Sequence, residues 1–310
     1  MSYRTIKDLQ LAGQRALVRV DFNVPVNEAG EITDTTRLER ALPTIKALTE
    51  RGAKVVLLSH FGRPKGGVVP SMSLKPVAHA LSEMLHERVF FGEDCIGPKA
   101  KQAVSEAGSG DIVLLENTRF HKGEEANDQA FVEALAENGD VYVNDAFSAA
   151  HRAHASTEGL AHVLPAAAGK AMERELDYLT QALAAPKPPM MAVVGGAKVS
   201  TKLDVLTNLI DKAQYLVVGG GMANTFLLAM GLDVGKSLAE PDLVDTAKAI
   251  LAKAGGAGCE IVLPMDVVVA KEFKAGTPSE VKAADAVAAD EMGLDLGPDS
   301  VDHIAGLMEK

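Results

Sequence analysis

Five arginines in the first half of this 310-residue chain could do chemistry as a group. They are Arg19, Arg37, Arg63, Arg119 and Arg152. Four of them lie in or beside short polar loops that follow apolar runs. A guanidinium group is planar, permanently charged and matched in shape to carboxylate and phosphate groups. The set therefore indicates a binding site for a small polyanionic ligand.

The apolar runs before these loops predict how the arginines converge. The runs start near residues 16, 54, 111 and 141, and a polar loop and then a helical stretch follow each of them. This order is typical of a parallel strand, a turn and a helix. Because open parallel sheets bind ligands at the carboxyl ends of their strands, we expect the loops to meet at one edge of a sheet.

Composition excludes several classes of function. The net charge of −11 argues against a general binder of nucleic acid or of anionic membranes, which need a basic surface. No run approaches eighteen apolar residues and the first ten residues lack an apolar signal core, so we expect a cytoplasmic protein without a membrane partner. The only cysteines, Cys95 and Cys259, are far apart and predict reduced, half-buried thiols.

Strand-like and helix-like segments alternate from residue 16 onward, which is typical of a doubly wound α/β protein. A helical stretch over 170–183 ends before a segment with three prolines in four positions, which cannot continue a helix. We expect a first domain over 1–169, a helical and proline-rich connector over 170–189, and a second domain over 190–310. Glycines follow the strands of the second domain where arginines follow those of the first, so two different ligands are expected.

The segment Gly195-Gly-Ala-Lys-Val-Ser-Thr-Lys follows a strand-like run and is expected to open a helix. Its glycines let a ligand approach the backbone, the helix N-terminus offers free amides, and Lys198 and Lys202 are spaced to share one helical face. The spacing is not that of a Walker A loop. A nucleotide phosphate site and a plain glycine turn with solvated lysines both fit. Gly219-Gly-Gly could likewise seat a flat base or form a tight turn.

Polar residues accompany the arginines in the first domain. Asp21 and Asn23 share one loop and could both accept from ligand hydroxyls, although Asp21 could equally form a structural ion pair. His60 would add a neutral donor beside Arg63. His151 and His154 flank Arg152, but no third and fourth metal ligands lie nearby in the sequence, so no metal site is expected.

Seven motifs closely resemble, in the same order, those of the phosphoglycerate kinase family. They are Arg19-Val-Asp-Phe-Asn-Val-Pro, Ser59-His-Phe-Gly-Arg-Pro, Leu115-Glu-Asn-Thr-Arg-Phe, Asn144-Asp-Ala-Phe-Ser-Ala-Ala-His-Arg-Ala-His, Gly195-Gly-Ala-Lys-Val-Ser-Thr-Lys, Gly219-Gly-Gly-Met-Ala-Asn-Thr-Phe and Leu263-Pro-Met-Asp. The resemblance implies an α/β fold of two Rossmann-like three-layer αβα lobes with parallel sheets. It also implies reversible phosphoryl transfer between ATP and the carboxylate of 3-phosphoglycerate, giving 1,3-bisphosphoglycerate and ADP in glycolysis and gluconeogenesis.

The resemblance also assigns residues to ligands. Arg37, Lys198 and Lys202 match the catalytic positions, whereas Arg19 matches a motif position that is not expected to be a ligand. The positions that match the 3-phosphoglycerate site are Asp21, Asn23, Arg37, His60, Phe61, Gly62, Arg63, Arg119 and Arg152. The positions that match the nucleotide site are Gly195, Gly196, Ala197, Lys198, Lys202, Gly219 and Gly220.

Further expectations follow from the family pattern. Mg²⁺ is expected to arrive with ATP or ADP, the lobes to bend about the connector, and the protein to be a monomer. Family members continue beyond the position of Lys310 into segments that include a metal-holding acidic loop, so the second lobe is expected to be incomplete, with the Mg²⁺ ligand beyond residue 310. An alternative therefore stays open, in which the chain is a truncated and catalytically inactive fragment that binds 3-phosphoglycerate. A Rossmann-type dehydrogenase is disfavoured because no GxGxxG precedes an acidic ribose ligand.

Overall fold

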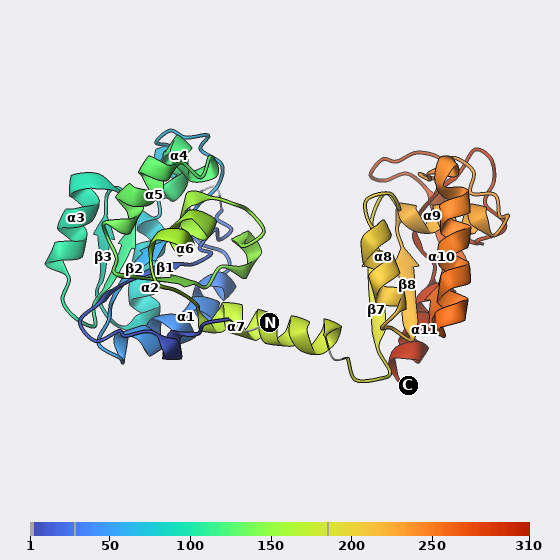
Figure 1. Cartoon of the computed structure of the whole chain (residues 1–310). Helices are drawn as coiled ribbons and strands as arrows, with labels where there is room; N and C mark the ends of the chain where they lie inside the picture. The colour runs from blue at the N-terminus through green and yellow to red at the C-terminus, as the bar shows by residue number, and fades with distance from the viewer. Residues whose placement is uncertain (1–2, 28, 185) are drawn as a thin grey trace. The chain divides into compact units, whose positions relative to one another are not determined.

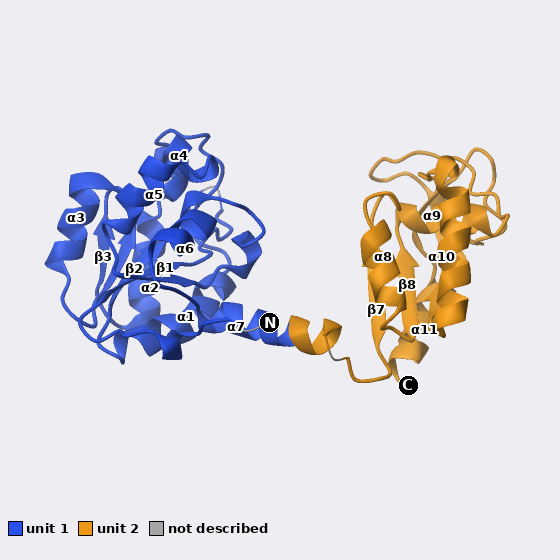
Figure 2. Cartoon of the chain, in the orientation of Figure 1, with its two compact units in different colours: residues 1–178 blue, residues 179–310 orange. Residues whose placement is uncertain are grey.

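The computed structural model describes residues 3–27, 29–184 and 186–310. The chain forms two compact units, residues 1–178 and 179–310 (Figure 2). Helix α7, Lys170–Leu183, crosses the boundary between the units, and Ala185 of the predicted connector lies outside the described residues. In the part of the chain that is described, none of the helices combines the length and the apolar character needed to cross a membrane.

Unit 1 is built on one six-stranded parallel sheet in the order β3-β4-β2-β1-β5-β6 (Figure 1). Its strands are β1 Arg15–Arg19, β2 Lys54–Leu58, β3 Val89–Gly92, β4 Ile112–Leu115, β5 Val141–Asn144 and β6 Ala166–Ala168. Its helices are α1 Thr36–Thr49, α2 Lys75–Leu85, α3 Gly97–Glu106, α4 Lys122–Glu125, α5 Gln129–Ala136, α6 Leu160–Val163 and the start of α7. The alternation of strand and helix predicted from residue 16 onward is confirmed.

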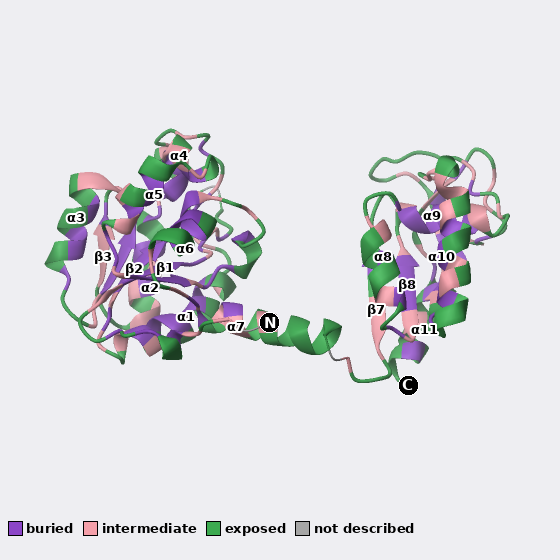
Figure 3. Cartoon of the chain, viewed as in Figure 1, coloured by how far each residue is buried: buried purple, intermediate pink, exposed green. Residues whose placement is uncertain are grey.

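Alternation of side chains along each strand creates two cores in unit 1. Val18 and Leu57 belong to a core with residues of α1 and α2, whereas Leu17 and Leu58 belong to a core with residues of α3, α5 and α6. Because helices cover both faces of the sheet, the central strands are buried along almost their whole length (Figure 3). This explains why they are continuous apolar runs in the sequence.

Unit 2 holds two small sheets. Strands β7 Met191–Gly195, β8 Tyr215–Gly219 and β9 Glu260–Val262 are parallel, and their main core includes residues of α8 Leu203–Ile210, α9 Gly221–Ala229 and α10 Val244–Ala257. Leu307 of α11, Pro298–Met308, packs with Val217 and Val262, the side chains of the opposite face. Unit 2 therefore has the same αβα layering as unit 1.

The second sheet of unit 2 is antiparallel, which the expectation of parallel sheets did not include. Its strands are β10 Asp266–Ala270, β11 Ser279–Ala283 and β12 Met292–Leu296, with β10 in the middle. Four of the five residues of β11 are exposed. A strand with so little apolar burial carries no continuous apolar run, and so the sequence gives little sign of it.

Candidate functional site

The carboxyl ends of the parallel strands in unit 1 bring the predicted loops together. Phe22 N, after β1, donates to Ser59 Oγ, after β2, at 2.9 Å. The buried side chain of Asn117, after β4, accepts from Phe61 N at 3.1 Å and donates to Phe61 O at 2.7 Å. Side chains bonded to backbone therefore fix three loops against one another at this edge of the sheet, as the strand pattern predicted.

Asp21 is paired with Arg37, so of the two interpretations of Asp21 the structure shows the ion pair. Arg37 Nη1 lies 2.6 Å from Asp21 Oδ2, and Ser148 Oγ donates to the same oxygen at 2.5 Å. Burial acts to raise the pKa of Asp21, but the bonds from Ser148 and Asn23 N and the charge of Arg37 outweigh it and lower the pKa. These groups line a hollow of about 190 Å³. The Arg37 side chain is 44% exposed and can reach a ligand there.

Gly62 is held from both sides by predicted site residues. Asn23 Oδ1 accepts from Gly62 N at 2.9 Å, and Arg119 Nη1 donates to Gly62 O at 2.9 Å. The φ of +60° at Gly62 lies in the left-handed region, which favours glycine. The amide oxygen of Asn23 is thus engaged within the loop, whereas the buried Arg119 keeps donors for a ligand beside its ion pair with Glu125 at 3.1 Å.

Arg19 sets the tautomer of His60. Arg19 Nη2 lies 3.0 Å from His60 Nδ1, and both side chains are buried. Because a guanidinium can only donate, Nδ1 must accept and the ring proton must lie on Nε2. Burial, followed by the charges of Arg19 and Arg119, lowers the pKa of His60 to about 3. His60 is therefore a neutral imidazole with its Nε2–H as the available donor.

A buried chain of polar residues holds Arg19 in turn. Arg19 Nε donates to Ser156 Oγ at 2.7 Å, and Ser156 N donates to Glu124 Oε2 at 3.0 Å. Arg19 is 1% exposed and Glu124 is fully buried. These bonds hold the Arg19 side chain in the interior. Ser156 and Glu124 belong to no motif that identified them beforehand, whereas Asn117 lay within the Leu115-Glu-Asn-Thr-Arg-Phe string.

Arg63 and Arg152 are the least constrained cations of the cluster. Arg63 is exposed on the loop that carries His60, and Arg152 is partly exposed. The charge of Arg152 lowers the pKa of both His60 and Arg119, so its guanidinium belongs to the same electrostatic cluster. Neither side chain makes a hydrogen bond or ion pair to another described residue. Both are free to turn toward an anion.

Two glycine loops meet at the carboxyl ends of β7 and β8 in unit 2. Gly195 and Gly219 are partners in the parallel ladder, and Met222 N donates to Gly196 O at 2.9 Å. Gly220 adopts φ 65° and ψ −161°, a conformation that only glycine adopts readily. A Cβ at Gly220 would lie 3.0 Å from Gly196 O. The loops therefore present closely packed, accessible backbone of the kind a phosphate or a base can approach.

The two lysines of this region do not share a helical face, and that prediction was wrong. Helix α8 begins only at Leu203, after a turn in which Lys202 N donates to Val199 O at 2.9 Å. Glu240 draws Ser200 toward itself by accepting from its hydroxyl at 2.6 Å and its backbone N at 3.0 Å. Lys198 thus lies on the loop itself and is exposed, while Lys202 is the residue that precedes the helix.

Larger hollows lie elsewhere in each unit and are not lined by any of the five arginines. One of about 600 Å³ is lined by the segment that joins β10 to β11 and includes Lys271, Glu272 and Glu280. Another of about 900 Å³ lies beside α2 and is lined by residues of both signs, among them Lys75 and Glu83. Because the arginine cluster lies outside both, the size of a hollow alone does not identify the site of a polyanion.

Comparison with known proteins places this geometry in context. A family model described as phosphoglycerate kinase matches residues 6–310. The phosphoglycerate kinase of Rhizobium meliloti (strain 1021) is 63% identical over 305 residues, which are 98% of this chain and 76% of that protein. The structure of phosphoglycerate kinase from Coxiella burnetii is 41% identical with a TM-score of 0.83, covering 99% of this chain and 77% of that one. The enzyme structure from Pyrococcus horikoshii OT3 is 30% identical with a TM-score of 0.79, covering 98% and 78% respectively.

Proposed function

The chain belongs to the phosphoglycerate kinase family, and on that basis we propose how its residues divide the work of phosphoryl transfer between ATP and 3-phosphoglycerate. The enzyme class and the reaction follow from the family, and nothing in the comparisons favours the alternative of an inactive binding fragment. The proposal concerns the individual residues, the metal and the setting in which the protein works.

We assign 3-phosphoglycerate to the arginine cluster of unit 1. The observation that carries this assignment is the set of cationic groups at the carboxyl edge of one sheet, with Arg119 buried beside the neutral His60 and Arg37 beside Asp21. A phosphate and a carboxylate together need several permanent cations and at least one neutral donor. Arg63 and Arg152 supply further charge, and Asn23, Phe61 and Gly62 supply the shape of the loop.

Arg37 is proposed to exchange partners during the reaction. The nucleophile is a carboxylate that is already ionised, so no general base is needed and catalysis consists of alignment and charge neutralisation. Asp21 holds Arg37 in place by the 2.6 Å ion pair. When the transferred group carries developing charge, the exposed guanidinium can follow it and stabilise the transition state.

We assign the nucleotide to the two glycine loops of unit 2. The bond from Met222 N to Gly196 O makes the loops one surface, with Gly195, Ala197 and Gly219 as further exposed or partly exposed backbone. Lys198 and Lys202 are proposed to neutralise the phosphates. Because Lys198 lies before the helix and not within it, its side chain can move with the phosphoryl group more freely than a helical lysine.

Mg²⁺ is the metal that this family uses with its nucleotide. Hard cations of this kind bind carboxylate and phosphate oxygens. The described glycine loops offer lysines and backbone, and the nearby Glu240 is bonded to Ser200. These groups do not fit a resident Mg²⁺ site, so the ion is proposed to be held through the nucleotide phosphates. A cytoplasmic location and a monomeric state complete the proposal.

Titration calorimetry with 3-phosphoglycerate tests the assignment of unit 1. The unaltered chain should bind one equivalent with an affinity that falls as salt rises, because the contacts are between charges. Arg119→Ala should weaken binding about tenfold or more, whereas Arg88→Ala, which removes an arginine stacked on Phe90 at the edge strand, should leave it unchanged. No heat at millimolar ligand, or equal effects of the two substitutions, would contradict the assignment.

A further inference from the structure

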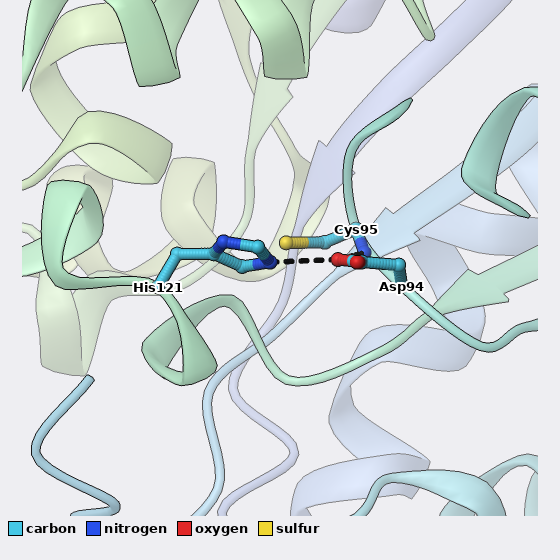
Figure 4. A group of neighbouring side chains, drawn as sticks. All are labelled: Asp94, Cys95 and His121. Atoms are coloured by element: carbon cyan, nitrogen blue, oxygen red, sulfur yellow. Dashed lines mark hydrogen bonds and ion pairs between the residues drawn. The ribbon is translucent and has the colours of Figure 1, made fainter. Parts of the chain in front are cut away.

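Three side chains with different metal-binding atoms meet in unit 1 outside the residues assigned to the substrates. Asp94, Cys95 and His121 each offer one ligand atom, and these atoms all lie within 4.8 Å of one another (Figure 4). Phosphoryl transfer as described above uses none of the three. The two parts of the group are 26 positions apart in sequence, so their spacing gave no metal motif.

The fold holds the group in place before any ligand binds. Asp94 and Cys95 follow β3, while His121 lies between the Thr118–Phe120 turn and α4. Asp94 Oδ1 accepts from Cys95 N at 2.7 Å and lies 2.7 Å from His121 Nε2. The ring of His121 packs on Phe131 with centroids 5.2 Å apart. Backbone and packing contacts therefore orient all three side chains toward one point.

We propose that Asp94, Cys95 and His121 form a binding site for a zinc-class divalent cation. Thiolate, imidazole and carboxylate are the three ligand types that Zn²⁺ takes in proteins, and three protein ligands leave a fourth position for water. The sulfur favours Zn²⁺ over Mg²⁺ or Ca²⁺, which take oxygen ligands. This site is separate from the Mg²⁺ that accompanies the nucleotide.

The local charge favours a cation. Burial raises the pKa of the Cys95 thiol well above its usual range, and the charges of Asp94, Glu124 and Glu116 raise it further. The same carboxylates that oppose a free thiolate attract a divalent ion. On binding, the S–H bond breaks, a metal–sulfur bond forms and the proton leaves to solvent, so affinity should rise with pH.

Binding requires the ligand atoms to rearrange around the ion. Metal bonds of about 2.1 Å in tetrahedral geometry require the Asp94 oxygen and the His121 nitrogen to separate from 2.7 Å to about 3.4 Å. The Asp94 side chain is 37% exposed and that of His121 is 30% exposed, whereas Cys95 is fully buried. The ion therefore approaches from the side of Asp94 and His121, with Cys95 as the innermost ligand.

Cobalt spectroscopy on the metal-free chain tests the site directly. Co²⁺ should bind with one equivalent and give tetrahedral visible bands together with a near-ultraviolet thiolate-to-cobalt band, and Zn²⁺ should remove both. Calorimetry with Zn²⁺ in buffers of different protonation enthalpy should show release of about one proton. An ion pair beside a buried thiol, with no metal function, would give no bands at millimolar Co²⁺ and would overturn the proposal.

Substitutions identify the ligands. His121→Gln, Asp94→Asn and Cys95→Ser should each lower metal affinity about tenfold or more, and Cys95→Ser should abolish the thiolate band. Cys259→Ser, which removes the other buried cysteine, should change neither. Circular dichroism confirms folding, and His121→Gln, at a partly exposed side chain, gives a readout if Cys95→Ser does not fold. The site would be refuted by cobalt bands that survive both His121→Gln and Cys95→Ser. It would also be refuted by bands that vanish only in Cys259→Ser.

Discussion

The candidate anion sites of the two units lie at the same place in their folds but are built in different ways. In both, the candidate site lies at the carboxyl ends of parallel strands. Unit 1 builds its site from side chains, with arginines and a neutral histidine held by buried hydrogen bonds. Unit 2 builds its site from backbone, with two glycine loops bonded to each other at Met222 and Gly196.

The difference teaches what each site tolerates. A site made of side chains depends on charge and on the residues that aim the charge, and it should be sensitive to salt. A site made of backbone depends on space and on dihedral angles that only glycine adopts readily. Removal of a side chain should therefore damage the first site, and addition of a methyl group should damage the second.

The largest effect is expected for Arg37→Ala. If its guanidinium acts mainly on the moving phosphoryl group, kcat should fall by about two orders of magnitude or more, as for loss of a transition-state donor. Steady-state kinetics in a coupled assay measure this, with Arg88→Ala as the control. If kcat fell by less than tenfold, Arg37 would have no larger role in the transition state than the other cations of unit 1.

A methyl group at Gly220 should have the next largest effect. Gly220→Ala forces a strained φ and places Cβ 3.0 Å from Gly196 O, which costs about 1–3 kcal/mol unless the loop moves. The KM for ATP should rise about tenfold while the KM for 3-phosphoglycerate stays constant. Gly256→Ala is the matched control, because its Cβ would meet nothing within 4 Å and α10 favours alanine. Equal KM values for the two variants would show that the loops do not hold the nucleotide.

Arg63→Ala should affect binding more than catalysis. Its exposed side chain contributes charge without a fixed partner among the described residues, so we expect the KM for 3-phosphoglycerate to rise several-fold and kcat to change less than about twofold. The dependence of this KM on KCl concentration should also become weaker. A large loss of kcat would instead give Arg63 a transition-state role like that of Arg37.

The last effect concerns the dependence of stability on pH, through His60. Its pKa of about 3 in the folded state lies below the ordinary value of 6.5. As pH falls below 6.5 the unfolded chain takes up a proton that the folded chain refuses until about pH 3, so His60 lowers stability progressively through this window. The unfolding free energy should therefore fall less in His60→Gln than in the unaltered chain between pH 7 and pH 5, by about 2 kcal/mol.

Urea titrations of both proteins at pH 7 and pH 5 measure this difference. Proton–nitrogen correlation spectra of the histidine rings offer an independent check, since they should show His60 with its proton on Nε2 at every pH from 8 to 5. A ring that titrates near pH 6.5, or a proton on Nδ1, would contradict the role of Arg19.

Much of this arrangement could be read from the sequence, for reasons that the structure makes clear. Buried parallel strands such as β2 and β4 need apolar side chains on both faces, and this leaves continuous runs that are easy to recognise. The loops after them carry their polar residues at fixed distances from the strand ends. The convergence of Asp21, His60 and Arg119 therefore followed from the pattern of strand, loop and helix, because the carboxyl ends of parallel strands meet at one edge of a sheet.

Other features depended on contacts between distant segments. The antiparallel sheet of unit 2 includes an exposed strand without an apolar run. In the turn before α8, which carries Lys198 and Lys202, Ser200 is bonded to Glu240, forty positions later in the sequence. Glu124 and Ser156 support Arg19 from the interior. Composition does not reveal such partners, because a buried polar residue looks like a surface residue until its neighbours are known.

The burial of Arg19 also changes how the ligand's charge is to be counted. Five arginines of unit 1 were singled out from the sequence, but one of them, Arg19, spends donors on Ser156, His60 and the backbone carbonyl of Val20. Under the proposed assignment of 3-phosphoglycerate to this cluster, the ligand meets four guanidinium groups and one neutral imidazole instead of five positive charges. An inhibitor designed for this site should match that set.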